Sequence, residues 1–220
     1  ENKIWACERE KIHTIAPIFL LEGYNSVGQW KERLIHDFSW YSEIYPAFTY
    51  RLPTPADVRT IMSQYICITI DIKSAFPHAH FCYSNLVGFP CEDPMTGKKH
   101  YFASASPLFG MQAAPYICYT FLRFLADFFD RLNFPTLAYV DDFKIGVAKI
   151  SENLPDSEIK IRTEFAREIF TIAGMRLSPK IKLIPSTFNQ YIGKFFDTEK
   201  NVILPNIVKF PFLYEQQIEV

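Results

Sequence analysis

The chain has 220 residues, of which 49% are hydrophobic and 21% are charged, and its formal net charge is −1. These proportions are typical of a folded globular protein and exclude a disordered chain. The chain has only 8 glycines, which excludes a collagen-like or glycine-rich protein, since average usage would give about twice as many. Its apolar runs are far shorter than the roughly 20 residues that span a bilayer, so we expect no membrane segment.

The cysteines indicate the compartment. They number 5, and no two of them are spaced as CxxC. A disulfide framework or a zinc knuckle is therefore not expected, and a reducing, intracellular compartment (cytoplasm or nucleus) suits these thiols best. The chain begins at Glu1 rather than Met, and we interpret it as a piece of a longer protein.

Local signals define the predicted elements of the first half of the chain. Residues 31–39 have the pattern of a short strand that runs into a turn. Residues 54–64 begin with a threonine that can cap a helix and a proline that suits its first turn, so we predict a helix there. Residues 65–72 are mostly β-branched or aromatic, which predicts a buried strand with Asp71 at its end.

The second half continues with helices and strands in alternation. Apolar residues recur at steps of three and four over 114–133, which predicts an amphipathic helix. Two apolar strands, 136–140 and 143–147, are separated only by Asp141 and Asp142, which is typical of a tight hairpin with two acids at its tip. A second helix and three short strands are expected at 157–173, 181–184, 190–196 and 202–204. The pattern predicts an α+β fold with helices packed on one face of an antiparallel sheet.

The acids of this hairpin require an explanation. Adjacent carboxylates repel, and each raises the cost of ionising the other, so a bound cation would favour the pair. If the strand that ends in Asp71 lies beside the hairpin, three carboxylates converge, and hard oxygen ligands of this kind suit Mg²⁺. Two such ions, about 3.5–4 Å apart, would serve an in-line phosphoryl transfer. The alternative is a simple polar turn, since Asp is favoured in turns.

Six segments of the chain resemble, in order, the motifs of reverse transcriptases. Tyr139-Val140-Asp141-Asp142 resembles their catalytic tetrapeptide, and Ile70–Phe76 resembles their first catalytic motif, an Asp on a strand followed five residues later by an aromatic. The other segments are Arg33–Ser39, Pro107–Pro115, Ala173–Leu177 with Lys180 and Lys182, and Tyr191–Asp197. The segments RLIHDFS and YIGKFFD are closest to retrotransposons, of the tyrosine-recombinase (DIRS) type first and the gypsy type next.

The resemblance implies the fingers and palm of a right-hand polymerase whose thumb is absent. Fingers would comprise residues 1–66 and 78–106, and palm residues 67–77 and 107–200, the latter with a hairpin that grips the primer. Residues 201–220 would begin the connection to the missing thumb. Thumb and RNase H domains would belong to the full-length protein.

The resemblance also implies an activity, the addition of deoxynucleotides to a primer 3′-hydroxyl on an RNA or DNA template. Asp71, Asp141 and Asp142, with the backbone carbonyl of Ile72, would bind two Mg²⁺ ions, for which Mn²⁺ can substitute. Lys180 would protonate the leaving pyrophosphate, although Lys182 lies equally near the expected position. The implied nucleotide-binding residues are Arg33, Ile72, Phe76, Phe109 and Gly110, and the implied primer or template residues are Tyr139 and Gly193.

Two other functions stay open. A catalytically decayed or co-opted copy, which binds nucleic acid or a protein partner, is favoured by the near-neutral charge, because nucleic-acid enzymes usually carry more positive charge. A metal phosphohydrolase would use the same acids, and it would release phosphate from nucleotides without any primer.

Overall fold

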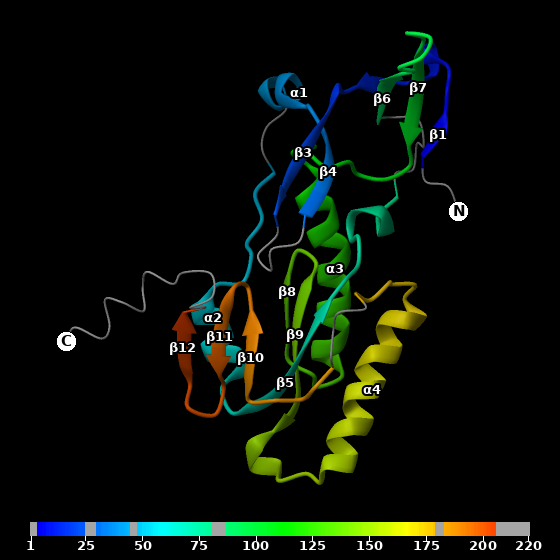
Figure 1. Cartoon of the computed structure of the whole chain (residues 1–220). Coiled ribbons are helices and arrows are strands. Elements are labelled where there is room, and N and C mark those ends of the chain that lie inside the picture. Colours follow the sequence, from blue (N-terminus) through cyan, green and yellow to red (C-terminus); the bar gives the residue numbers. More distant parts are fainter. Residues whose placement is uncertain (1–3, 25–29, 45–47, 81–86, 179–182, 206–220) are drawn as a thin grey trace, which may run out of the picture. The chain divides into compact units, whose positions relative to one another are not determined.

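The computed structural model shows an α+β chain (Figure 1) and confirms the predicted class. It describes residues 4–24, 30–44, 48–80, 87–178 and 183–205. Over these residues there are four α-helices and four small sheets, of which one is mixed. None of the helices in this part of the chain has the length and apolar character needed to cross a membrane.

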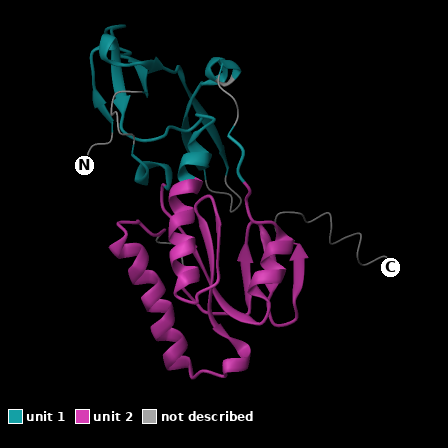
Figure 2. Ribbon diagram, turned by 180° about the vertical axis from the view of Figure 1, so that it is seen from behind, with its two compact units in different colours: residues 1–50, 75–118 teal, residues 51–74, 119–220 magenta. Residues whose placement is uncertain are grey.

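The chain divides into two compact units, each built from two separate stretches of sequence (Figure 2). Unit 1 consists of residues 1–50 and 75–118, and unit 2 consists of residues 51–74 and 119–220. The division into fingers and palm that the resemblance implies stays a prediction.

Unit 1 contains a mixed four-stranded sheet of order β1-β7-β6-β2 and a two-stranded ribbon, β3-β4. Its core packs Phe38, Val87, Phe89 and Leu108 around Ala16. Its elements are β1 (Ile4–Ala6), a 3₁₀ turn (Arg9–Lys11), β2 (Thr14–Ile15), β3 (Ile18–Tyr24), β4 (Trp30–His36), α1 (Ser39–Ile44), a 3₁₀ turn (Phe76–His78), β6 (Val87–Glu92), β7 (Lys99–Ser104) and the first turn of α3 (Ala114–Arg131).

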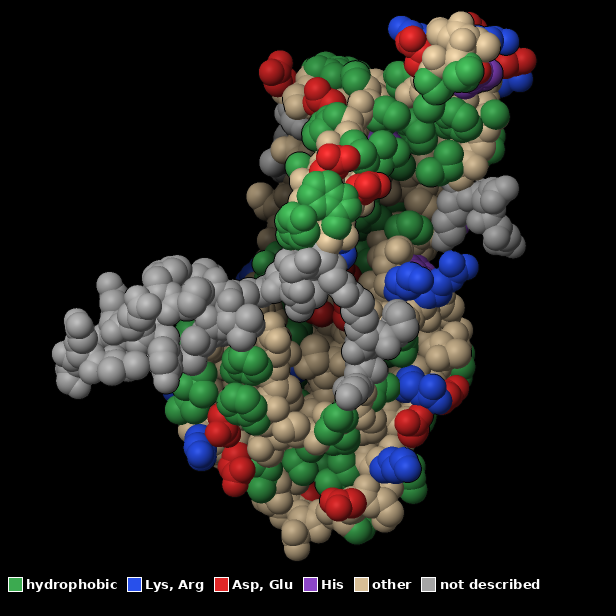
Figure 3. Space-filling view, in the orientation of Figure 1, with side chains coloured by type: hydrophobic (Ala, Val, Ile, Leu, Met, Phe, Trp, Pro, Cys, Tyr) green, Lys and Arg blue, Asp and Glu red, His purple; other side chains and the backbone are tan. Residues whose placement is uncertain are grey.

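The β3-β4 ribbon confirms the strand predicted at 31–39. The two strands pair in antiparallel register from Ile18 opposite His36 to Tyr24 opposite Trp30. The strand ends at His36, because the Asp37 carboxylate then accepts a hydrogen bond from the backbone N–H of Ser39, where α1 begins. Large apolar side chains stay exposed along the ribbon (Figure 3), among them Phe19, Leu20, Leu21, Trp30 and Leu34.

Unit 2 is built on an antiparallel three-stranded sheet of order β5-β9-β8, and a second antiparallel sheet of order β10-β11-β12 packs against it. Its elements are α2 (Pro55–Met62), β5 (Tyr65–Asp71), the remainder of α3, β8 (Thr136–Tyr139), β9 (Asp142–Lys149), a 3₁₀ turn (Ile150–Glu152), α4 (Asp156–Ile172), β10 (Phe188–Tyr191), β11 (Lys194–Asp197) and β12 (Val202–Pro205).

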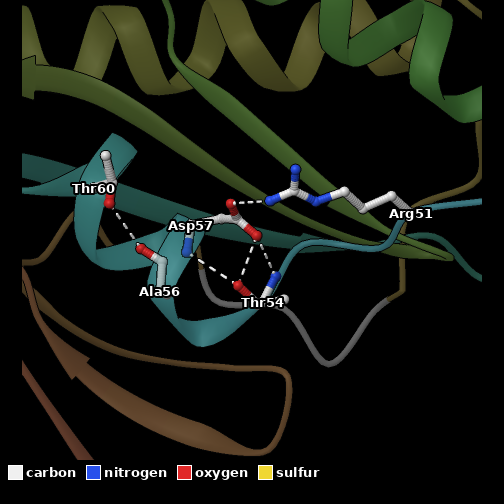
Figure 4. Close-up of polar contacts among 5 residues, drawn as sticks. All are labelled: Arg51, Thr54, Ala56, Asp57 and Thr60. Atoms are coloured by element: carbon white, nitrogen blue, oxygen red, sulfur yellow. Dashed lines mark hydrogen bonds and ion pairs between the residues drawn. The ribbon is translucent and has the colours of Figure 1, made fainter.

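Helix α2 begins as the sequence predicts. The Thr54 hydroxyl accepts a hydrogen bond from the Asp57 backbone N–H at 3.3 Å, and the Asp57 carboxylate accepts one from the Thr54 N–H at 2.8 Å (Figure 4). Arg51 pairs with the same carboxylate at 2.9 Å. This capping box satisfies N–H groups that the first helical turn leaves without partners. The helix ends at Met62 rather than Gln64, because Gln64 adopts a φ of 62°, outside the helical region.

Both faces of the β5-β9-β8 sheet are covered. On one face Phe143 of β9 lies with its ring centre 4.9 Å from that of Phe170 in α4, and Phe170 stacks on Phe129 of α3 at 5.3 Å. The other face carries a cluster formed by α2, β5, β8 and the second sheet, namely Val58, Met62, Cys67, Leu137, Tyr191 and Phe196. The prediction that the helices cover one face holds for α3 and α4 and is wrong for α2, since helical periodicity identifies buried positions without identifying the face on which they pack.

The C-terminal strands differ from the prediction in one respect. The strand expected at 190–196 is two strands, β10 and β11, joined by the turn Ile192-Gly193, whose φ values are 42° and 76°. Positive φ at both central positions is the type I′ geometry that suits a tight hairpin. Strand β12 confirms the prediction at 202–204. Of the strand expected at 181–184, residues 181–182 lie outside the described residues, and Leu183 and Ile184 are not in a strand.

Candidate active site

Asp71 and Asp142 lie opposite each other in unit 2. In the antiparallel pairing of β5 with β9, Asp71 is the partner of Asp142, and Ile70 is the partner of Phe143. Opposed residues of an antiparallel pair project from the same face of the sheet, so the two carboxylates share a face. The buried Ile70 and Phe143 fix this register, because a slip of either strand by one residue would turn its carboxylate to the face that packs on α3 and α4.

The turn of the acidic hairpin consists of Val140 and Asp141, one residue earlier than the predicted tip. Tyr139 pairs with Asp142, so Asp142 is the first residue of β9. Val140 has a φ of 56°, which is an outlier for a β-branched residue and costs of order 1–3 kcal/mol. Strained residues of this kind concentrate at functional sites, and this one directly precedes Asp141.

Asp141 lies beside the end of β5. Its backbone carbonyl accepts a hydrogen bond from the Ile72 N–H at 2.9 Å. Burial raises the pKa of the Asp141 carboxyl above its ordinary value, its own backbone N–H opposes this shift, and the Asp71 carboxylate adds to it. Among the described residues, no ion pair joins Asp71 or Asp141 to a basic side chain. A bound cation would therefore relieve a repulsion that these contacts leave in place.

The end of β5 is also held from its other side. The Lys73 N–H donates to the Arg176 carbonyl at 2.7 Å, and the Ser178 N–H donates to the Asp71 carbonyl at 2.9 Å. Ile72 forms a β-bridge with Leu177. The segment around Arg176 belongs to the fourth of the catalytic motifs in the resemblance. Its lysines, Lys180 and Lys182, lie outside the described residues.

The donor set can be compared with what Mg²⁺ requires. Within the described part of the chain, no three His, Cys, Asp or Glu side chains gather as a complete metal-binding group. Mg²⁺ is usually held by one or two carboxylates, and water and substrate phosphates fill its other positions. The facing Asp71 and Asp142, with the Asp141 carboxylate and the Ile72 carbonyl next to them in the chain, are hard oxygen donors of this type. These residues fit a magnesium site that the substrate completes.

The primer or template candidates lie on the same face of the β5-β9-β8 sheet as the paired acids. Tyr139 is half-buried and packs against the cluster that contains Tyr191 and Phe196. The Tyr191 hydroxyl donates to the Leu137 carbonyl at 3.1 Å and so fastens β10 to β8. Gly193 occupies the turn between β10 and β11, two residues beyond Tyr191.

Sequence reasoning missed Lys144, which lies on the same face of β9 as Asp142. Lys144 is fully buried, and its ammonium group donates to the side-chain oxygen of Asn189 in β10 and lies 5.7 Å from the centre of the Phe196 ring. The Asn189 amide in turn donates to the Cys67 and Ser186 carbonyls at 3.2 and 3.0 Å. Burial lowers the pKa of Lys144. The available signal was a lone lysine within an apolar strand.

The other nucleotide-binding candidates belong to unit 1. Phe76 begins a 3₁₀ turn, and its ring centre lies 4.9 Å from that of Phe109. Arg33 is exposed on β4, opposite Leu21 of β3. No hydrogen bond, ion pair or ring contact of the described residues joins Arg33 to either phenylalanine. The structure thus brings Phe76 and Phe109 together and leaves Arg33 outside this pair.

The backbone conformation and the close packing at position 110 both require a glycine. Its φ is 100°, and a Cβ atom there would overlap the backbone carbonyl oxygen of His36. Gly110 is one of the nucleotide-binding residues that the resemblance implies. In the structure, the group that approaches is the main chain of His36, so the residue is required by packing within unit 1.

Gly110→Ala is expected to lower the free energy of unfolding by about 2–3 kcal/mol, because it adds a backbone clash to the strain of positive φ. Gly97→Ala is the matched control, since Gly97 has a φ of 67° and open space around it, so it isolates the strain alone. Urea unfolding of the two variants and the parent measures the difference. Equal losses in the two variants would contradict the close approach to His36.

A scan against models of known protein families found no match, and a search of curated proteins found none either. The resemblance to reverse transcriptases therefore rests on the motifs themselves.

Proposed function

We propose that the chain is the fingers and palm of a reverse transcriptase, with fingers at residues 1–66 and 78–106 and palm at residues 67–77 and 107–200. It would add deoxynucleotides to a primer 3′-hydroxyl on an RNA or DNA template and release pyrophosphate. The observation that carries the proposal is the Asp71–Asp142 pair beside the strained turn that bears Asp141. A simple polar turn would need neither a third acid from a distant strand nor a valine at positive φ.

Each acid would have a role in holding the metal ions. Asp71, Asp141 and Asp142, with the Ile72 carbonyl, would hold Mg²⁺ or its substitute Mn²⁺. Bound metal would supply the positive charge that lowers the pKa of the primer hydroxyl and neutralises the leaving pyrophosphate. The protein's own contribution is to fix the carboxylates in advance. Hydrogen bonds hold the end of β5 from Asp141 on one side and from the Arg176–Ser178 segment on the other.

The resemblance also assigns the substrate contacts to individual residues. Phe76 and Phe109 present aromatic faces of the kind on which sugars and bases pack, and the exposed Arg33 guanidinium is a fixed fork of donors for phosphate oxygens. Tyr139 and Gly193 would contact the primer or template. Lys180 would donate the proton to the leaving group.

The proposal is tested by primer extension with an RNA template, four deoxynucleotides and Mg²⁺. The expected result is a product whose sequence is directed by the template and whose formation stops when the primer or the divalent ion is omitted. Release of phosphate from nucleotides without a primer would instead indicate a metal phosphohydrolase. Binding of the primer–template without extension would indicate a non-catalytic module. Either of these results overturns the proposal.

A further inference from the structure

His36 fastens the Phe109–Gly110 loop to the end of β4. Its backbone N–H donates to the Phe109 carbonyl oxygen at 2.8 Å, and its ring Nδ1 lies 3.2 Å from the same oxygen. A carbonyl oxygen only accepts, so Nδ1 must carry the ring proton. The next residue, Gly110, packs on the carbonyl of His36 itself. The loop is thus held by the main chain and by the ring of one residue.

The other ring nitrogen of His36 has no such partner. His36 is 4% exposed, and its Nε2 is buried without a hydrogen-bond partner among the described residues. In the Nδ1–H tautomer, Nε2 bears a lone pair and no proton, and a neutral ring can be packed in this way. Protonation would place a second N–H, with a full charge, where no acceptor is available.

The surroundings of the His36 ring are apolar. The Phe89 ring of β6 meets it edge-on at 4.9 Å between centres, and Ile18 of β3 is its strand partner. The core cluster around Phe89 contributes further apolar groups from β6, from β7, from the residue after β2 and from the loop on either side of Phe109, namely Val87, Phe102, Ala16, Leu108 and Met111. Nothing in this set can stabilise an imidazolium ion.

The titratable groups nearest to this cluster do not offset the burial. On β4 itself the charged residue on the same face is Glu32, four residues before His36 and paired with Glu22 of β3. The Asp37 carboxylate is engaged by Ser39 at the start of α1. Tyr41 of α1 borders the cluster as a phenol, which stays neutral near pH 7. Burial lowers the pKa of His36 below its ordinary value of 6.5, and the bond to Phe109 acts in the opposite direction.

We propose that His36 is a positioning residue that holds the Phe109–Gly110 loop only while its imidazole is neutral, so that protonation releases the loop and weakens nucleotide use. The effect of loop release on nucleotide use rests on the proposed function, whereas the release of the loop on protonation does not. The proposal deepens the proposed function, because it makes nucleotide affinity depend on a histidine that need not touch the substrate.

The sign of the pH effect follows from the direction of the pKa shift. Above the ordinary value of 6.5 both the packed and the released ring are neutral, and the loop is held. As the pH falls below this value, the released ring takes up a proton that the packed ring resists, so release is favoured by up to about tenfold per pH unit. The shift of the equilibrium towards the released loop grows with falling pH until the packed ring itself is protonated.

Three variants separate the possible roles of the ring. His36→Asn keeps a side-chain donor near the position of Nδ1 but does not titrate. His36→Leu fills much of the same volume without a donor. His100→Asn removes an exposed histidine of β7 in the same unit and is the matched control.

The first readout is independent of activity. In ¹⁵N NMR spectra of the chain, the His36 ring is expected to show the Nδ1–H tautomer at neutral pH and to titrate below the ordinary histidine value of 6.5. The Gly110 amide signal is expected to move with the same midpoint. An Nε2–H tautomer, or a His36 ring that titrates at or above 6.5, would overturn the proposal.

The second readout is the KM for deoxynucleotides in primer extension. Between about pH 7.5 and about pH 5.5 the KM of the parent should rise by up to about tenfold relative to that of His36→Asn, with kcat changed less. His36→Leu should show a raised KM at every pH, and His100→Asn should follow the parent. If His36→Asn kept the full pH dependence of the parent, the proposal would be wrong. Failure of the proposed function would appear differently, as no extension at any pH while the NMR titration remains measurable.

Discussion

Asp142→Asn is expected to reduce primer extension by about a thousandfold or more, because it removes one of the two carboxylates that face each other across β5 and β9 and would hold the metal ions. The fold should remain intact. Since Asp142 is directly opposite Asp71, loss of one like charge should leave the free energy of unfolding unchanged or raise it by about 0.2–1 kcal/mol in metal-free buffer. Single-turnover extension rates and urea unfolding measure the two quantities.

Asp127→Asn is the matched control for this substitution. Asp127 also belongs to unit 2, but its carboxylate forms an exposed ion pair with Arg123 at 2.7 Å on α3, and such pairs contribute about 0–1 kcal/mol. This variant should extend primers at the rate of the parent. Extension by Asp142→Asn at more than a few per cent of the parent rate would remove Asp142 from the catalytic set.

Asn189→Leu is expected to lower the free energy of unfolding by about 3–5 kcal/mol, because it leaves the buried Lys144 ammonium without its acceptor. Adding Lys144→Met to this variant should restore at least half of the loss, since an apolar side chain of similar length then replaces the stranded charge. Urea unfolding of the parent, the two single variants and the double variant gives the coupling energy between the two positions.

The exposed Lys160 of α4 provides the control, because Lys160→Met should change stability by no more than about 0.5 kcal/mol. If the effects of Asn189→Leu and Lys144→Met simply add, the two side chains are not coupled. The interaction between Lys144 and Asn189 would then not stabilise the packing of β9 against the β10-β11-β12 sheet.

Most elements of the fold could be predicted because their signals are local. Thr54 and Pro55 mark the start of α2, periodic apolar residues define α3 and α4, and the β-branched run before Asp71 defines β5. The turn at Val140-Asp141 was displaced by one residue, because a strand that is buried on both faces shows no alternation to mark its last residue. The position of α2 on the second face of the sheet was also missed, since packing partners are not local.

In the candidate site, too, the local features could be predicted and the contacts between remote residues could not. The sequence identified Asp71, Asp141 and Asp142, but their opposition depends on the register between two strands that lie some 70 residues apart, as Asp71 and Asp142 do. Lys144 and His36 escaped notice because their partners are remote, Asn189 at 45 residues and Phe109 at 73 residues along the chain. A buried polar residue can be recognised in a sequence only when its partner is known.

The order of strands in unit 1 has a consequence for how the chain folds as it is made. Strand β1 pairs only with β7 within the described sheet, and Ile4 lies opposite Ser104. At a synthesis rate of about 5–20 residues per second, the ribosome needs ~5–20 s to reach β7 after β1 has been made. During that time β1 has no ladder partner, and an unpaired strand with exposed backbone groups is a template for wrong pairing. Segment 51–74 of unit 2 is synthesised in the same interval. Unit 1 therefore cannot complete its fold before this segment of unit 2 has been made, and β1 is among the last of its strands to find a partner.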